Sequence, residues 1–115
     1  LESYKTLDEA FRFKIAMTEL IVRYELYDHD YIEQRVKQLK KEFKKSLAAE
    51  EFAREKRLIE IILLLINTAS ARTDKKVQLA IKNFNARENS EQKDGSEIIN
   101  YNAWLEEKIF FKVKE

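Results

Sequence analysis

The tripeptide Asp28-His29-Asp30 is the one place in this sequence where histidine meets carboxylate side chains. Two carboxylates and an imidazole can hold a divalent cation, and the imidazole favours zinc or another transition metal. Neighbouring residues on a turn point in different directions, however, so a metal site would need further ligands from elsewhere in the chain. We therefore interpret the tripeptide as a turn in which Asp30 caps the next helix, and we predict no metal and no cofactor.

The other residues that could do chemistry lack the arrangement that catalysis needs. The chain has no cysteine, one histidine and one glycine, which excludes cysteine nucleophiles, phosphate-binding glycine loops and the usual serine-nucleophile motifs. Paired carboxylates such as Glu50/Glu51 and Glu106/Glu107 are sequence neighbours, so on a helix they lie about 100° apart and do not converge on one substrate atom. We predict that the chain is not an enzyme and has no small-molecule substrate.

A basic segment gives the clearest asymmetry of charge. Residues 31–57 carry nine basic and five acidic side chains, whereas residues 1–30 carry four basic and seven acidic ones. Five of the cations form a candidate binding face for phosphate groups: Arg35, Lys37, Lys41, Lys44 and Lys45. The alternative is a solvated face, or one that pairs with the acidic first segment. A net charge of only +1 makes the long-range field weak, so nucleic-acid binding through residues 35–57 is our second hypothesis.

Aromatic residues near the end of the chain offer a different kind of surface. Side chains at helical spacing usually belong to a core, but an exposed group of them would make a docking patch. The candidates for such a patch are Trp104, Phe110 and Phe111.

Composition predicts the elements that must position these residues. The chain of 115 residues has one glycine and no proline, and tight turns draw on both, so their scarcity favours long helices over a sandwich or barrel. Hydrophobic residues make up 44% and charged residues 37%, which fits helices with one apolar and one solvated face. We predict an all-α fold of about five amphipathic helices, as stacked antiparallel hairpins or a small bundle, in a single domain of residues 1–115.

Periodicity and capping residues place the five helices. The expected ranges are 7–27 with Thr6 as cap, 31–45 with Asp30, 50–70, 74–88 with Thr73 or Asp74, and 97–110 with Ser96. Residues 46–49 form either a short turn or a continuous helix. The first helix has so wide an apolar stripe that we expect it to contact more than one neighbour. Leu58–Ile66 is apolar nearly all round, which predicts a buried helix, and its nine residues fall short of the roughly 20 that span a membrane.

Two short segments in the first half of the sequence resemble a known family. Leu20-Ile21-Val22-Arg23-Tyr24, followed by residues 27–32 (Tyr-Asp-His-Asp-Tyr-Ile), resembles the helix–turn–helix of tetratricopeptide-like repeats, and the chain also resembles helical tails of uncharacterised bacterial proteins. Glu33 and Lys40 stand where that family has small residues, and no proline closes the unit. The resemblance implies a scaffold or binding role, with no catalytic residues.

These observations lead to one leading hypothesis. We expect a non-enzymatic, cytoplasmic helical interaction or scaffold module that binds a protein partner or a second copy of itself. The chain begins at Leu1 and not at methionine, which we interpret as a segment of a longer protein.

Overall fold

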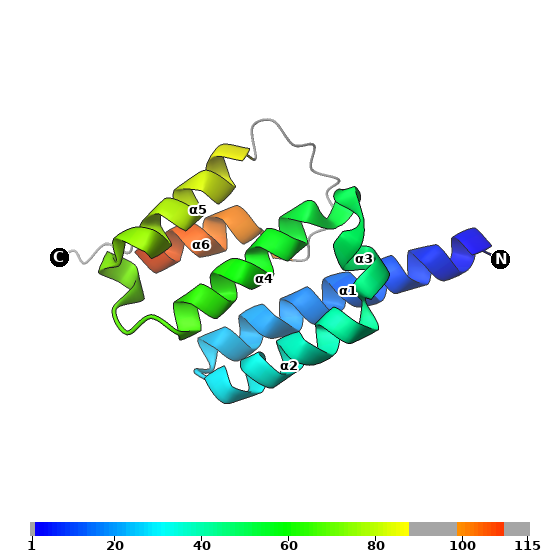
Figure 1. Cartoon of the computed structure of the whole chain (residues 1–115), viewed down its shortest axis with the longest axis horizontal. Helices are drawn as coiled ribbons and strands as arrows, with labels where there is room; N and C mark the ends of the chain where they lie inside the picture. Colours follow the sequence, from blue (N-terminus) through cyan, green and yellow to red (C-terminus); the bar gives the residue numbers. More distant parts are fainter. Residues whose placement is uncertain (1, 88–98, 110–115) are drawn as a thin grey trace. The chain divides into compact units, whose positions relative to one another are not determined.

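The computed structural model describes the backbone of residues 2–87 and 99–109 and the side chains of residues 9–86 and 99–109. Within this part of the chain every regular element is helical, which confirms the predicted all-α class (Figure 1). The α-helices are α1 (Glu2–Glu25), α2 (His29–Glu42), α3 (Lys44–Ala48), α4 (Ala53–Ile66), α5 (Lys75–Arg87) and α6 (Tyr101–Ile109). Two short 3-10 helices are η1 (Glu50–Phe52) and η2 (Ala71–Thr73).

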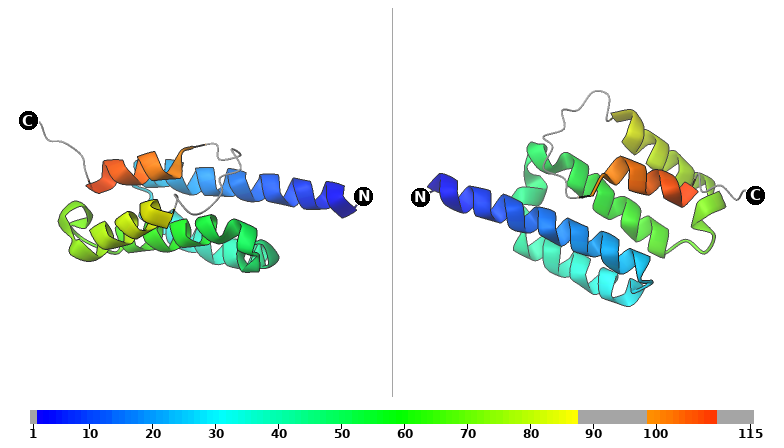
Figure 2. Two further views of the ribbon diagram at one scale, coloured as in Figure 1. Left: turned by 90° about the horizontal axis from the view of Figure 1, so that it is seen from above. Right: turned by 180° about the vertical axis from the view of Figure 1, so that it is seen from behind.

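The chain divides into two compact units, residues 1–59 and 60–115, and the division falls inside α4. Because the two units share one helix, the single domain of the sequence analysis stays a prediction. Each unit contains an antiparallel pair of helices: α1 with α2 in the first, and α5 with α6 in the second. Figures 1 and 2 show the members of each pair side by side.

The core of the first unit lies between α1 and α2. The buried positions of α2 continue into its C-cap, and they are Ile32, Val36, Leu39 and Phe43, at steps of four, three and four. This is the apolar face that the spacing predicts. The facing helix α1 buries Phe13, Met17, Leu20 and Ile21 at the same helical spacing. Removal of these side chains from water is the main stabilising contribution to the pair.

Helix α2 ends at Glu42, with Phe43 as its C-cap. The predicted second helix, which extends to Lys45, is therefore too long. Phe43 leaves the helical region with φ −112° and ψ 37°, and a separate short helix α3 follows. The ring of Phe43 packs against Phe13 at 5.1 Å between centroids, and Phe52 of η1 packs edge-on against Phe13 at 5.2 Å. Burial of two aromatic rings on Phe13 compensates for the lost helical hydrogen bonds. No glycine or proline marks this break in the sequence.

Helix α4 confirms that the apolar run at residues 58–66 is helical and largely buried. Its most buried members are Leu58, Ile59, Ile61, Ile62 and Leu65. The helix ends at Ile66, four residues before the predicted end. There Asn67 donates its side-chain amide to the carbonyl of Leu63 at 2.8 Å, and the Thr68 hydroxyl donates to the carbonyl of Leu64 at 2.7 Å. Both carbonyls also accept the backbone N–H of Asn67, at 3.2 and 3.3 Å, so the two side chains add to the last backbone hydrogen bonds of the helix.

One of the capping residues predicted for the second unit is confirmed. Asp74 accepts hydrogen bonds from the backbone N–H groups of Lys76 and Val77, which confirms Asp74 as the cap of α5. For the last helix, the predicted start at Glu97 and the cap at Ser96 lie outside the described residues. In the described part α6 begins at Tyr101, and the Asn100 side chain accepts from the N–H of Ala103 at 3.0 Å.

Two predicted caps in the first unit are wrong. Helix α1 already begins at Glu2, so Thr6 lies within it. Helix α2 begins at His29 after Asp28, so Asp30 lies inside its first turn and does not cap it. A carboxylate in the first turn still interacts favourably with the positive end of the helix dipole.

Candidate interaction surface on helix α1

Helix α1 and the residue that follows it expose four large apolar side chains along one face. Phe11 is 61% exposed, Ile15 45%, Val22 46% and Leu26 64%. Steps of four, seven and four residues place them within about 60° of one another around the helix axis. The buried face of α1, which contains Phe13, Met17 and Leu20, points the opposite way. We call these four residues the α1 apolar face.

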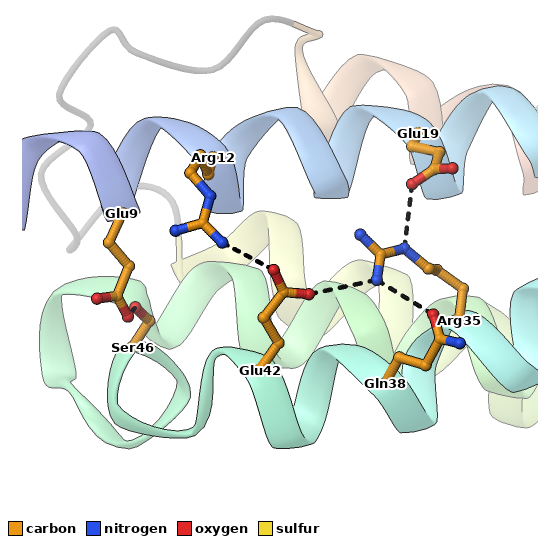
Figure 3. A network of polar contacts seen from close by, with 7 residues as sticks. All are labelled: Glu9, Arg12, Glu19, Arg35, Gln38, Glu42 and Ser46. Atoms are coloured by element: carbon orange, nitrogen blue, oxygen red, sulfur yellow. Dashed lines mark hydrogen bonds and ion pairs between the residues drawn. The ribbon is translucent and has the colours of Figure 1, made fainter.

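A row of polar contacts with α2 and α3 fixes the rotation of α1 about its axis (Figure 3). Arg35 lies between two carboxylates: its Nε donates to Glu19 at 3.2 Å, and its Nη1 donates to Glu42 at 3.5 Å. Glu42 also accepts from Nη2 of Arg12 at 2.8 Å, and the Ser46 hydroxyl donates to Glu9 at 3.1 Å. The row borders the buried face of α1 and leaves the α1 apolar face directed away from α2.

Glu19, at the centre of this row, has a carboxyl group whose pKa is shifted. Burial by itself raises the pKa of Glu19, but the hydrogen bonds from the Tyr31 hydroxyl and from Arg35, together with the charges of Arg35 and Arg23, outweigh it. The pKa of Glu19 is therefore lowered overall. The same hydrogen bond, with burial, raises the pKa of Tyr31. These effects belong to a contact between two helices of one unit, and they create no open reactive group.

A buried ion pair anchors the other side of α1. The ammonium nitrogen of Lys14 lies 2.7 Å from Oε2 of Glu55, and it also lies 5.8 Å from the centroid of the Phe52 ring. Lys14 is the residue before Ile15, so the pair holds α1 in a fixed orientation next to this part of the α1 apolar face.

The turn after α1 ends the helix next to Leu26, the last residue of the α1 apolar face. Asp28 N–H donates to the carbonyl of Arg23 at 3.0 Å, and Tyr27 N–H donates to that of Tyr24 at 3.0 Å. These two bonds are the Schellman pattern, in which the residue after the cap adopts a left-handed conformation. That residue is Tyr27, with φ 60° and an 84% exposed side chain. Glycine is the usual residue at such a position, so tyrosine here carries a conformational cost.

The Asp28-His29-Asp30 turn forms no metal site in the described part of the chain. The His29 ring stacks on Tyr24 with centroids 5.5 Å apart, and Asp28 accepts from Arg23 at 3.1 Å. No group of three histidine, cysteine or carboxylate side chains there has the geometry to hold a metal ion.

The five cations of the predicted basic face lie in three different settings. Arg35 is directed toward α1, where Glu19 and Glu42 bind it. Lys37 and Lys41 are exposed on α2, whereas Lys44 and Lys45 are exposed on α3, beyond the break at Phe43. The break ends the continuous helix on which the predicted spacing of this face depended. Whether the exposed lysines bind phosphate groups stays a prediction.

The aromatic docking patch is not formed by Trp104. Trp104 is buried, with the ammonium of Lys108 lying 5.1 Å from the centroid of its ring. This position agrees with the core alternative, because α6 turns the Trp104 ring inward together with Tyr101 and Leu105. Phe110 and Phe111 lie outside the described residues.

Sequence reasoning found the width of the apolar stripe on α1 but not its exposed part. The stripe predicts more than one neighbour for α1; α2 covers one side, and the α1 apolar face remains exposed. Ile15 follows the charged residue Lys14, and Val22 precedes the charged residue Arg23. The order of residues along the sequence therefore does not show that Ile15 and Val22 belong to one apolar face. A helical projection that set residues 11, 15, 22 and 26 on one line would have shown them.

Comparisons with protein-family models, with curated proteins and with solved structures give no match to this chain. In the described residues, no helix combines the length and the apolar character that crossing a membrane requires.

Proposed function

We propose that this chain is a non-enzymatic protein-interaction module, and that the α1 apolar face is its docking surface. The observation that carries the proposal is the set of four large apolar side chains, 45–64% exposed, aligned on one helix. Scattered apolar residues are normal on a protein surface, but several large apolar side chains on one face of a helix support an interaction site.

The surroundings of the face support a docking role. The polar row with α2 and the Lys14–Glu55 pair fix the rotation of α1, so the four side chains are presented in one orientation before a partner arrives. A surface that is already ordered loses less conformational entropy on binding. The lack of cysteine is compatible with a cytoplasmic location, which we also propose.

The nucleic-acid alternative has weaker structural support. Its best hydrogen-bond donor, Arg35, already binds two carboxylates within the first unit. An arginine that leaves such contacts to bind phosphate gains less than one that is free.

Site-specific photo-crosslinking tests the docking proposal. The full chain would carry a photo-reactive phenylalanine analogue at position 15, be mixed with protein from cells that express it, and be irradiated. We expect crosslinked protein adducts, because a partner seated on the α1 apolar face lies against this side chain.

The matched control is the same analogue at position 79. Leu79 on α5 is 60% exposed, so it samples random encounters equally well. Adducts at position 15 that do not exceed those at position 79 would contradict the proposed function.

A further inference from the structure

We infer that the partner of the α1 apolar face is a second copy of this chain, docked antiparallel to the first through a two-fold axis near residues 18 and 19. This inference rests on the proposed function and specifies its partner. It also predicts which side chains meet: Phe11 of one copy against Leu26 of the other, and Ile15 against Val22.

The spacing of the face is symmetric about its midpoint. Phe11 and Leu26 lie at equal distances on either side of a point between residues 18 and 19, and so do Ile15 and Val22. Reversal of the helix direction therefore places each large side chain at the height of another large side chain. A two-fold interface requires this property, because the same patch must be complementary to itself.

The area of the face suits a pair of copies. With roughly 150–250 Å² for a large apolar side chain, the observed exposed fractions give on the order of 400 Å² per copy. The strip is about 22 Å long, and a second α1 matches it in length and width. Two copies would bury on the order of 800 Å² of apolar surface, an area in the range of weak and transient encounters. We therefore expect a reversible dimer with a dissociation constant of about 10–100 µM.

Sedimentation equilibrium of the full chain from about 5 to about 500 µM tests this dimer. We expect a monomer–dimer equilibrium for the wild type. Ile15→Lys and Val22→Glu should each raise the dissociation constant at least about ten-fold, because each places one charge against an apolar side chain of the other copy. Both positions are about half exposed, and circular dichroism would verify that each variant is folded.

The double variant tests the antiparallel register. In Ile15→Lys/Val22→Glu, antiparallel docking sets each new lysine opposite a new glutamate of the other copy, so the dissociation constant should return to within about three-fold of the wild type at low salt. The matched control, Ile15→Lys/Val22→Lys, sets like charges opposite each other and should stay monomeric. Leu79→Lys, which also charges an exposed apolar site, should leave the dissociation constant unchanged.

Three results would overturn the inference. The first is a wild type that is monomeric at about 500 µM. The second is a dimer that Ile15→Lys and Val22→Glu leave intact, which would place the interface elsewhere. The third is loss of the dimer in both single variants without recovery in Ile15→Lys/Val22→Glu, which would exclude the antiparallel register. If the chain is monomeric and yet position 15 crosslinks to another protein, the proposed function survives and only the second copy is excluded.

Discussion

The ammonium nitrogen of Lys14 lies 2.7 Å from Oε2 of Glu55, and the two side chains are only 9% and 2% exposed. The pair joins α1 to the beginning of α4 across 41 positions of sequence. Two charges so far from water are costly to desolvate, and their mutual attraction compensates only while both are present. The energetic importance of each residue therefore depends on its partner.

Lys14→Met should lower the free energy of unfolding by about 3–5 kcal/mol, because it removes the Lys14 ammonium from beside the buried Glu55 carboxylate. Urea denaturation at neutral pH measures the loss. Lys14→Met/Glu55→Leu should recover most of it, since both charges are then removed. Arg12→Met breaks an exposed ion pair with Glu42 and should cost less than about 1 kcal/mol. Equal losses at Lys14 and Arg12 would show that burial of the pair has no energetic effect.

Tyr27→Gly should raise the free energy of unfolding by about 1 kcal/mol. Tyr27 has φ 60°, which favours glycine, and its side chain is 84% exposed, so little packing is lost. Thermal or urea denaturation checks this. Glu25→Gly is the matched control two residues earlier, within α1, where glycine should instead destabilise by about 1 kcal/mol. A loss of stability in Tyr27→Gly would mean that the tyrosine ring holds the turn, for instance through its contact with His29.

Local pattern was enough to predict the helices and the buried face of α2, because Ile32, Val36, Leu39 and Phe43 repeat at helical spacing. The break at Phe43 could not be predicted in this way. It depends on rings that are distant in sequence, since Phe13 receives both Phe43 and Phe52. The direction of Arg35 has the same kind of cause: its two carboxylates come from α1 and from the end of α2. The sequence therefore shows where the cations stand along the chain, but it does not show which of them face solvent.

Ile62→Ala should lower the free energy of unfolding by about 2–5 kcal/mol, as for other buried large-to-small substitutions. Ile62 is fully buried on α4, whereas Leu64 two residues later is only half-buried. Leu64→Ala should therefore cost clearly less, although the sequence around the two residues is equally apolar. Chemical denaturation of both variants gives the comparison. A larger loss at Leu64 would contradict the orientation of α4.

The chain should show no salt-sensitive binding to DNA or RNA at about 50 mM salt, where phosphate contacts are strong. Arg35 is held by Glu19 and Glu42, and the exposed lysines are divided between α2 and α3. Fluorescence anisotropy with labelled oligonucleotides makes the measurement. Binding that weakens steeply as salt rises, and that Lys37→Ala/Lys41→Ala abolishes, would favour the nucleic-acid hypothesis instead.

Acid should destabilise the first unit partly through Glu19. Its pKa in the folded chain is lowered, with the opposing effect of burial outweighed by hydrogen bonds from Tyr31 and Arg35. A lowered folded pKa stabilises the fold at pH values above the ordinary glutamate pKa of about 4.3, and this stabilisation is lost as pH falls from there through the folded pKa. Glu19→Gln should therefore be less stable than the wild type at pH 6, and the difference should shrink toward pH 3. Urea denaturation over this range tests the sign, with Glu33→Gln at an exposed position of α2 as control for the lost charge. A difference that stays constant between the two pH values would show that ionised Glu19 does not stabilise the α1–α2 pair.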